Sequence, residues 1–167
     1  MLQEIRFRPL QIADLNDVQS LYQKSLSESV DPLSEIRVNE RQLAWEMRRL
    51  RQSLLADQRY ICWVAESDSG LVGYIAGVIE SQASMFRIDT YVSVNEIYVE
   101  KAYRRSGIAT ELGRHLEEHS RVLGISWIKM QCMVDNDELK AFFESLSYKT
   151  SVVEMRRRLD VGDGKPE

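Results

Sequence analysis

Hydrophobic and polar residues follow different periods in different parts of this chain. In the first third, apolar side chains recur at helical spacing, which predicts helices over residues 13–29 and 40–58. A short alternating stretch, "IRFRPL", precedes them and predicts a strand that Pro9 ends. Asn39 is a candidate N-cap for the second helix, because Gln42 stands three residues further on. The first third is therefore expected to be strand, helix and helix.

From residue 59 onward, the pattern predicts three consecutive strands and then helix, strand, helix and strand. These elements are expected over residues 59–67, 71–80, 90–100, 108–124, 126–134, 135–147 and 151–159. Consecutive strands form an antiparallel meander, whereas strands joined through a helix run parallel. The predicted fold class is therefore α/β, with one mixed sheet, antiparallel at its centre and locally parallel, flanked by helices on both faces. One domain over residues 1–160 is followed by a tail, residues 161–167.

The helix predicted over residues 108–124 has a distinct apolar face. The residues expected to point inward are Ile108, Leu112, Leu116 and Leu123. Gly124 is expected to close the helix, because glycine readily adopts the left-handed conformation found after a C-terminus.

The composition is that of a soluble, folded protein. Apolar residues make up 44% of the chain, enough for a packed core, and no apolar run is long enough to cross a bilayer. The N-terminus lacks the apolar segment of a secretory signal. Cys62 and Cys132 lie among apolar neighbours, so we expect two buried free thiols and a reducing, cytoplasmic location. The net charge of −4 argues against nucleic-acid binding.

A cationic turn follows the strand predicted over residues 90–100. Lys101, Arg104 and Arg105 gather in "EKAYRRSGIA", directly before a helix. Backbone N–H groups at a helix start carry the positive end of the helix dipole and bind anions, phosphate above all. Gly107 allows a backbone conformation closed to other residues and lets a phosphate approach. The alternative is a solvated run of charge beside an ordinary helix start.

The segment "YRRSGIA" resembles the pyrophosphate-binding turn of the GNAT superfamily of acyl-CoA-dependent N-acyltransferases. That pattern is Arg or Gln, two residues, Gly, one residue, and Gly or Ala, and it is met by Arg104, Gly107 and Ala109. The order of predicted elements is also the family's, so the resemblance extends over residues 4–159. Arg105 departs from it, because the family often has a further Gly at that position.

This resemblance implies acetyl-CoA as cosubstrate, lying where the fourth and fifth strands separate. Its pantetheine arm is expected to pair, like an added strand, with the backbone of Ile97 and Val99, and Tyr98 is also expected to bind the cofactor. The residues expected to hold its pyrophosphate are Arg104, Arg105, Ser106, Gly107, Ile108, Ala109 and Thr110.

Glu96 is the candidate catalytic base. Strict alternation gives its strand two faces, one with Val92, Val94, Glu96 and Tyr98 and the other with Asn95, Ile97 and Val99. Burial of a carboxylate raises its pKa, and an ammonium acceptor must lose a proton before it can attack a thioester. In the resembling family a glutamate on this strand often removes that proton, directly or through water. The alternatives are a solvent-facing edge carboxylate or a salt bridge to an arginine.

The segment "VDNDELKAFFESLSYK" resembles a second recognisable part of the family. Asn136 matches its helix-opening Asn, and Phe143 stands where the family commonly has a Tyr that protonates the departing thiolate. Because Phe has no proton to donate, water, Tyr98 or Tyr148 would have to substitute. Ser147 replaces the family's usual Gly. The alternatives are a capping role for Asn136, and core packing of Phe143 instead of packing against the cofactor.

Two other patterns carry less chemistry. His115 and His119 are four residues apart, a spacing that can bind zinc, but no third ligand accompanies them. We expect an ordinary helix flank and no metal. Cys132 has no histidine nearby in sequence, so an acyl-carrying role is not expected.

The predicted function is direct acetyl transfer from acetyl-CoA to a primary amine, on a small molecule or a protein, with Glu96 as base. An acidic rim near the acceptor favours a cationic amine. Its residues are Glu28, Asp31, Glu35, Glu80 and Asp89. The alternatives are a non-catalytic acyl-CoA-binding sensor or interaction module, and a nucleotide-binding regulatory domain. A homodimer is common in the resembling family.

Overall fold

The chain forms two compact units, Met1–Met133 and Val134–Glu167. The computed structural model describes residues 4–28, 48, 59–81, 90–132 and 136–152. Nearly all of the helix predicted over residues 40–58, its candidate cap Asn39 and most of the strand predicted over 151–159 lie outside the described residues.

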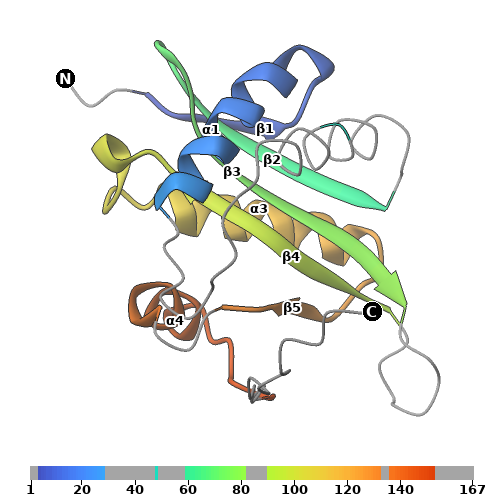
Figure 1. The fold of residues 1–167 in the computed structure, drawn as a ribbon. Coiled ribbons are helices and arrows are strands. Elements are labelled where there is room, and N and C mark those ends of the chain that lie inside the picture. Colours follow the sequence, from blue (N-terminus) through green and yellow to red (C-terminus); the bar gives the residue numbers. More distant parts are fainter. Residues whose placement is uncertain (1–3, 29–47, 49–58, 82–89, 133–135, 153–167) are drawn as a thin grey trace, which may run out of the picture. The chain divides into compact units, whose positions relative to one another are not determined.

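The described strands of the first unit form one open sheet of five. Their order in sequence and in space is β1 (Arg6–Pro9), β2 (Tyr60–Ser67), β3 (Gly70–Ser81), β4 (Thr90–Val99) and β5 (Ile128–Met130). The first four pair antiparallel, and β5 pairs parallel to β4 (Figure 1). The predicted meander and the parallel pair are therefore confirmed, although β5, at 3 residues, is shorter than expected.

Helices cover both faces of this sheet, as predicted. The helices and helical turns of this unit are η1 (Ile12–Asp14), α1 (Leu15–Glu28), η2 (Lys101–Tyr103) and α3 (Ile108–Val122). Neighbouring residues of β2 point to opposite sides, so Ile61 packs in a cluster with α3 whereas Cys62 packs in one with α1. In the second unit, α4 (Asp137–Ser145) confirms the short helix that the pattern predicts. The α/β fold class is confirmed.

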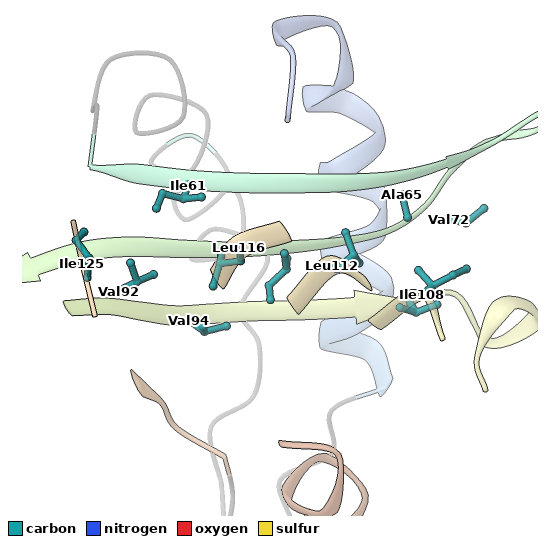
Figure 2. Packing of buried hydrophobic residues seen from close by; sticks show 11 residues of the cluster. Ile61, Ala65, Val72, Val92, Val94, Ile108, Leu112, Leu116 and Ile125 are labelled. Carbon is teal, nitrogen blue, oxygen red and sulfur yellow. The ribbon is translucent and has the colours of Figure 1, made fainter. Parts of the chain in front are cut away.

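The larger core lies between the sheet and α3 (Figure 2). Ile108, Leu112 and Leu116 are spaced by four along the helix and are at most 4% exposed. Leu123 was expected beside them, but it is 48% exposed. The reason is that α3 ends at Val122, and Gly124, at a φ of 74°, turns the chain there, as predicted for a helix-closing glycine.

The smaller core lies between the sheet and α1. Val18 and Leu21 contribute from the helix. The strand residues of this cluster are Cys62, Val64, Tyr74, Ala76 and Tyr98. Cys62 is a buried free thiol, as predicted, and burial raises its pKa to about 12. This thiol therefore stays protonated and inert at neutral pH.

An ionic network ties the edge of the sheet to the start of α1. The Arg8 guanidinium donates to both Asp14 carboxylate oxygens, at 2.6 and 2.9 Å, and its Nε donates to Glu66 at 3.0 Å. Asp14 also accepts from the backbone N–H of Gln11 at 2.7 Å. Arg8 holds the pKa of Asp14 below its usual range, and Arg8 and Arg6 lower that of Glu66 to about 2. Both carboxylates therefore stabilise the folded state when they are ionised.

We expect Asp14→Asn to lower the free energy of unfolding by about 1–3 kcal/mol at pH 7, because a charge-assisted bidentate contact is lost. The folded-state pKa of Asp14 is depressed, so this contribution is present above the ordinary carboxyl pKa and fades as pH falls through the folded value. Urea unfolding at pH 7 and at lower pH measures it. The control, Asp17→Asn on the exposed side of α1, should change stability far less, and an equal loss would contradict the network's role.

Candidate functional site

A β-bulge in β4 organises the candidate site. Ala76 of β3 pairs with Glu96, but the next residue, Gly77, pairs with Val94, so Asn95 has no partner in the ladder. Gly77 has no room for a side chain at this point, because a Cβ would lie 2.8 Å from Cγ1 of Val92. The regular period of two is therefore broken between Val94 and Glu96.

The bulge corrects the predicted faces of β4. Val92 and Val94 belong to the α3 core, whereas Tyr98 belongs to the α1 core, as does Ala76 opposite Glu96. The expectation that Val92, Val94, Glu96 and Tyr98 share one face is therefore wrong. An extra residue shifts the alternation by one, and Glu96 and Tyr98 face α1 together.

Pairing between β4 and β5 also stops at the bulge. In the described residues the parallel pairs are Val92 with Ile128, Ser93 with Lys129, and Val94 with Met130. The β4 backbone after Asn95 has no partner in β5 along this edge. An unpaired strand edge can accept an extended ligand by main-chain hydrogen bonds. Within the described residues, this unpaired edge includes Ile97 and Val99, for which contact with the pantetheine arm stays a prediction.

One backbone hydrogen bond shows which main-chain groups of β4 face the edge that β5 leaves unpaired. The N–H of Glu100 donates to the carbonyl of Val72 at 2.9 Å, so Glu100 directs its main-chain groups toward β3. Residues of an antiparallel strand alternate in this respect, and Ile97 and Val99 therefore direct theirs to the open edge. The Val99 carbonyl already accepts from Nε of Arg104 at 2.8 Å. As far as the described residues show, the main chain of Ile97 and the Val99 N–H remain for an extended ligand, whereas the main chain of Tyr98 faces β3 and is not available to one.

The turn after β4 has the backbone geometry of an anion site. Gly107 has a φ of 84° and immediately precedes α3. The N–H of Glu111 donates to the Gly107 carbonyl at 3.0 Å as the first bond of the helix. The N–H groups of Ile108, Ala109 and Thr110 precede this bond and point outward from the helix start. A Cβ on Gly107 would meet nothing within 4 Å, so open space lies in front of the turn. These features fit a bound pyrophosphate.

The Arg104 side chain is engaged by protein groups. Besides the Val99 carbonyl, it donates to Glu28 at 2.6 Å, and its guanidinium lies 5.5 Å from the centre of the Tyr98 ring. Glu28 also accepts from the Tyr98 hydroxyl at 3.0 Å and lies 3.8 Å from Nζ of Lys101. Arg104 lowers the pKa of Glu28, which is therefore an ionised partner of the turn. Sequence reasoning missed this role because it treated Glu28 as part of an acceptor rim.

Other members of the predicted acidic rim are divided between described and undescribed parts of the chain. Glu80 accepts a hydrogen bond from the Tyr91 hydroxyl at 2.8 Å. Asp31, Glu35 and Asp89 lie outside the described residues.

Glu96 is half-buried where the two strands part, and burial raises its pKa to about 7. A carboxyl that titrates near neutral pH suits general-base catalysis, because it is both available and basic. Tyr74 lies on the same face of the sheet and is almost fully buried, at 1% exposure. No sequence signal points to a role for Tyr74, because it stands in an apolar strand and looks like an ordinary core aromatic.

The second unit bears out the local expectations for its helix. The Asn136 side chain caps α4 by accepting from the N–H of Leu139 at 3.0 Å. Phe143 is 4% exposed, and its ring centre lies 5.0 Å from those of Phe142 and Tyr148. Capping and packing are therefore observed. Contact of Asn136 or Phe143 with a cofactor stays a prediction.

The last candidates from the sequence are His115, His119 and Cys132, and both histidines contact Trp63. The His115 ring stacks on Trp63 with centres 4.4 Å apart, and Nδ1 of His119 accepts from the Trp63 indole at 3.3 Å. The described residues contain no group of three potential metal ligands. Cys132 was expected to be buried but is exposed, because β5 ends before it. No helix of the described chain is long and apolar enough to span a membrane.

Comparison with known proteins identifies a family. The model of the acetyltransferase (GNAT) family matches residues 16–148. This range contains Glu96, the bulge, the turn at Gly107 and α4. No curated protein is a significant match to the chain in sequence.

Several solved structures share the fold at low sequence identity. An aminoglycoside antibiotic 6'-N-acetyltransferase from Acinetobacter baumannii is 18% identical with a TM-score of 0.71, over 95% of this chain and 100% of its own. A predicted acetyltransferase with acetyl-CoA from Clostridium acetobutylicum is 16% identical with a TM-score of 0.73, over 93% and 96%. Glucosamine-6-phosphate N-acetyltransferase from Arabidopsis thaliana is 16% identical with a TM-score of 0.68, over 95% and 100%. These similarities confirm the fold.

Two residues that stand where the resembling family often has glycine adopt left-handed backbone conformations. Arg105 has a φ of 61° and Ser147 a φ of 70°. A side chain is strained in this region, whereas glycine is not.

We expect Ser147→Gly to raise the free energy of unfolding by about 0.5–1 kcal/mol. Chemical denaturation measures this effect. The control Ser145→Gly, inside α4, should lower stability by a similar amount, and a loss of stability in Ser147→Gly would contradict the strain.

Proposed function

We propose that this chain, which belongs to the acetyltransferase (GNAT) family, transfers an acetyl group from acetyl-CoA to a primary amine with Glu96 as general base. The observation that carries the proposal is the position of Glu96. It lies at the point where β4 and β5 part, next to the open backbone of Ile97, and its pKa is raised to about 7. The base and the backbone groups for an acyl donor therefore meet at one bulge.

Acetyl-CoA would lie along the open edge of β4. Ile97 and the Val99 N–H would bind its pantetheine arm, and the helix start after Gly107 would bind its pyrophosphate. Arg104 would support the turn through Glu28 and the Val99 carbonyl, and Arg105 would add positive charge. A strand N–H such as that of Ile97 would polarise the thioester carbonyl. Thr110 would add a hydroxyl group near the phosphates, whereas the Ser106 hydroxyl donates to the Tyr103 carbonyl at 2.5 Å and would have to turn to reach them.

The chemical step moves protons at both the nitrogen and the sulfur. Glu96 would take a proton from the ammonium and free its lone pair for attack on the thioester carbonyl; the C–S bond then breaks, CoA thiolate departs, and the nitrogen loses its second proton to water. The family's tyrosine acid is replaced by Phe143. Tyr98 is poorly placed to substitute, since its hydroxyl donates to Glu28 and its pKa is raised to about 12. Water or Tyr148 is the proposed proton source for the thiolate, which is stable enough to leave unassisted because free thiols have a pKa of about 8.5.

The acceptor is proposed to be a primary amine on a small molecule or a protein. The names of two structural neighbours describe acetylation of an aminoglycoside and of glucosamine 6-phosphate, which supports an amine acceptor. Release of free thiol from acetyl-CoA, measured against a panel of amines, tests this proposal. Tight binding of acetyl-CoA without turnover of any amine would instead favour an acyl-CoA-binding sensor. A cytoplasmic location and a homodimer stay predictions.

We expect Gly107→Val to weaken acetyl-CoA binding at least about 100-fold by calorimetry. The new side chain would fill the open space before the helix start and oppose the left-handed backbone. Gly124→Val is a matched control, because Gly124 also has positive φ and open surroundings but lies at the other end of α3. Both variants should lose comparable stability. Equal affinity for acetyl-CoA in the two would contradict the proposed turn.

We expect Glu96→Gln to reduce kcat/KM for the amine by about 100-fold or more at pH 7, with little effect on the affinity for acetyl-CoA. In the wild type, activity should fall as pH decreases through about 7, because the base becomes protonated. The variant should lack this acidic limb. Glu117→Gln, on α3, serves as control. A loss of less than about threefold in Glu96→Gln would remove Glu96 as the base.

A further inference from the structure

A buried tyrosine hydroxyl lies near Glu96 without a hydrogen-bond partner. Tyr74, on β3, is 1% exposed, and its Oη is buried and unpaired among the described residues. Nearly all buried polar groups in folded proteins have a partner, so this exception calls for a physical explanation. Phenylalanine would fill the same space without leaving a polar atom unsatisfied.

The register of the sheet brings this hydroxyl toward Glu96. Tyr74 pairs with Tyr98, and two residues further along β3 Ala76 pairs with Glu96. Tyr74 and Glu96 are therefore diagonal neighbours on the α1 face, a relation that long side chains can bridge. Ala76, directly opposite Glu96, carries only a methyl group. The ladder is regular from Tyr98 to Glu96, on one side of the bulge, so Glu96 shares the α1 face with Tyr98 and Tyr74.

Glu96 is the strongest acceptor for the Tyr74 proton among the titratable groups that face Tyr74. These groups are Glu96 and Tyr98 from β4, Cys62 from β2 and Tyr22 from α1. Only Glu96 has a carboxylate, which accepts a hydrogen bond more strongly than a phenol or a thiol does. Burial and the charge of Glu96 both raise the pKa of Tyr74, so the phenol stays protonated and acts as a donor.

We propose that Tyr74 is a positioning residue for the acetyl transfer: its hydroxyl donates, through one bridging water molecule, to the Glu96 carboxylate. A bridging water satisfies a buried hydroxyl that lies beyond direct reach of its acceptor. The contact orients the carboxylate and stabilises its ionised form against burial. The inference rests on the proposed role of Glu96 as base, because a carboxylate that takes protons must be held toward the acceptor.

The test is Tyr74→Phe, which keeps the ring and removes the hydroxyl. Loss of a donor to a carboxylate should raise the pKa of Glu96 by about half a unit or more. The acidic limb of the kcat profile should move upward by the same amount, so that kcat below pH 7 falls about threefold or more, while KM for acetyl-CoA stays unchanged. Protein stability should fall slightly, because the bridging water and the Glu96 carboxylate lose a hydrogen-bonding partner.

Carbon-13 NMR titration of the glutamate carboxyl groups measures the pKa of Glu96 without any need for activity, with Glu96→Gln assigning the signal. Tyr60→Phe is the control, because Tyr60 lies in β2 and is half-buried. It should leave the Glu96 titration unchanged. An unshifted Glu96 pKa and pH profile in Tyr74→Phe would overturn the proposal and reduce Tyr74 to a core residue.

Two further measurements distinguish a failure of the Tyr74–Glu96 contact from a failure of Glu96 as the base. If the Glu96 pKa shifts in Tyr74→Phe but Glu96→Gln retains full activity, the contact exists and the proposed base is wrong. In the wild-type protein, magnetisation transfer between water and the Tyr74 ring should reveal the bound water. Its absence would overturn the bridge even if the variant failed to fold.

Discussion

One extra residue in β4 determines the candidate site. Because Asn95 has no counterpart in β3, the alternation of the strand shifts by one and the pairing with β5 ends. Both consequences are needed together. Without the shift, Glu96 would point into the apolar core against α3, and without the end of pairing the backbone of Ile97 would be occupied by a neighbouring strand. A single local irregularity thus presents, at one place, a carboxylate and a main-chain edge that no described strand pairs with.

Charge near the turn is distributed differently from what the cationic sequence suggests. Glu28, at the end of α1, binds Arg104 and the Tyr98 hydroxyl and lies near Lys101. These contacts connect α1, β4 and the turn, and they neutralise part of the positive charge. The outward N–H groups of α3 add positive potential in front of Gly107, and this contribution depends on helix geometry and needs no excess of basic residues.

The turn conformations also show that backbone geometry can persist where the residue type does not. Arg105 and Ser147 stand where the resembling family has glycine, and both are left-handed. Neither residue prefers this region, so the surrounding structure must impose it. For Arg105 this conformation falls in the turn between β4 and α3, two residues before Gly107.

Much of this protein follows from local sequence. The spacing of Ile108, Leu112 and Leu116, the end of α3 near Gly124 and the cap at Asn136 depend on residues close together in the chain, and all three are observed. The same holds for the meander and the parallel crossover, which follow from the order of elements.

Long-range contacts decided the rest. A bulge is a relation between two strands, so the alternation of β4 alone assigned Val94 and Glu96 to the same face. The end of β5 before Cys132 and the pairing of Glu28 with Arg104 likewise depend on distant segments. The sequence by itself determined which residues could bind a phosphate and accept a proton, because those properties belong to side chains and helix starts. Only the tertiary structure decided which way Glu96 faces and what lies beside it, because strand register is set between chain segments that are far apart in sequence.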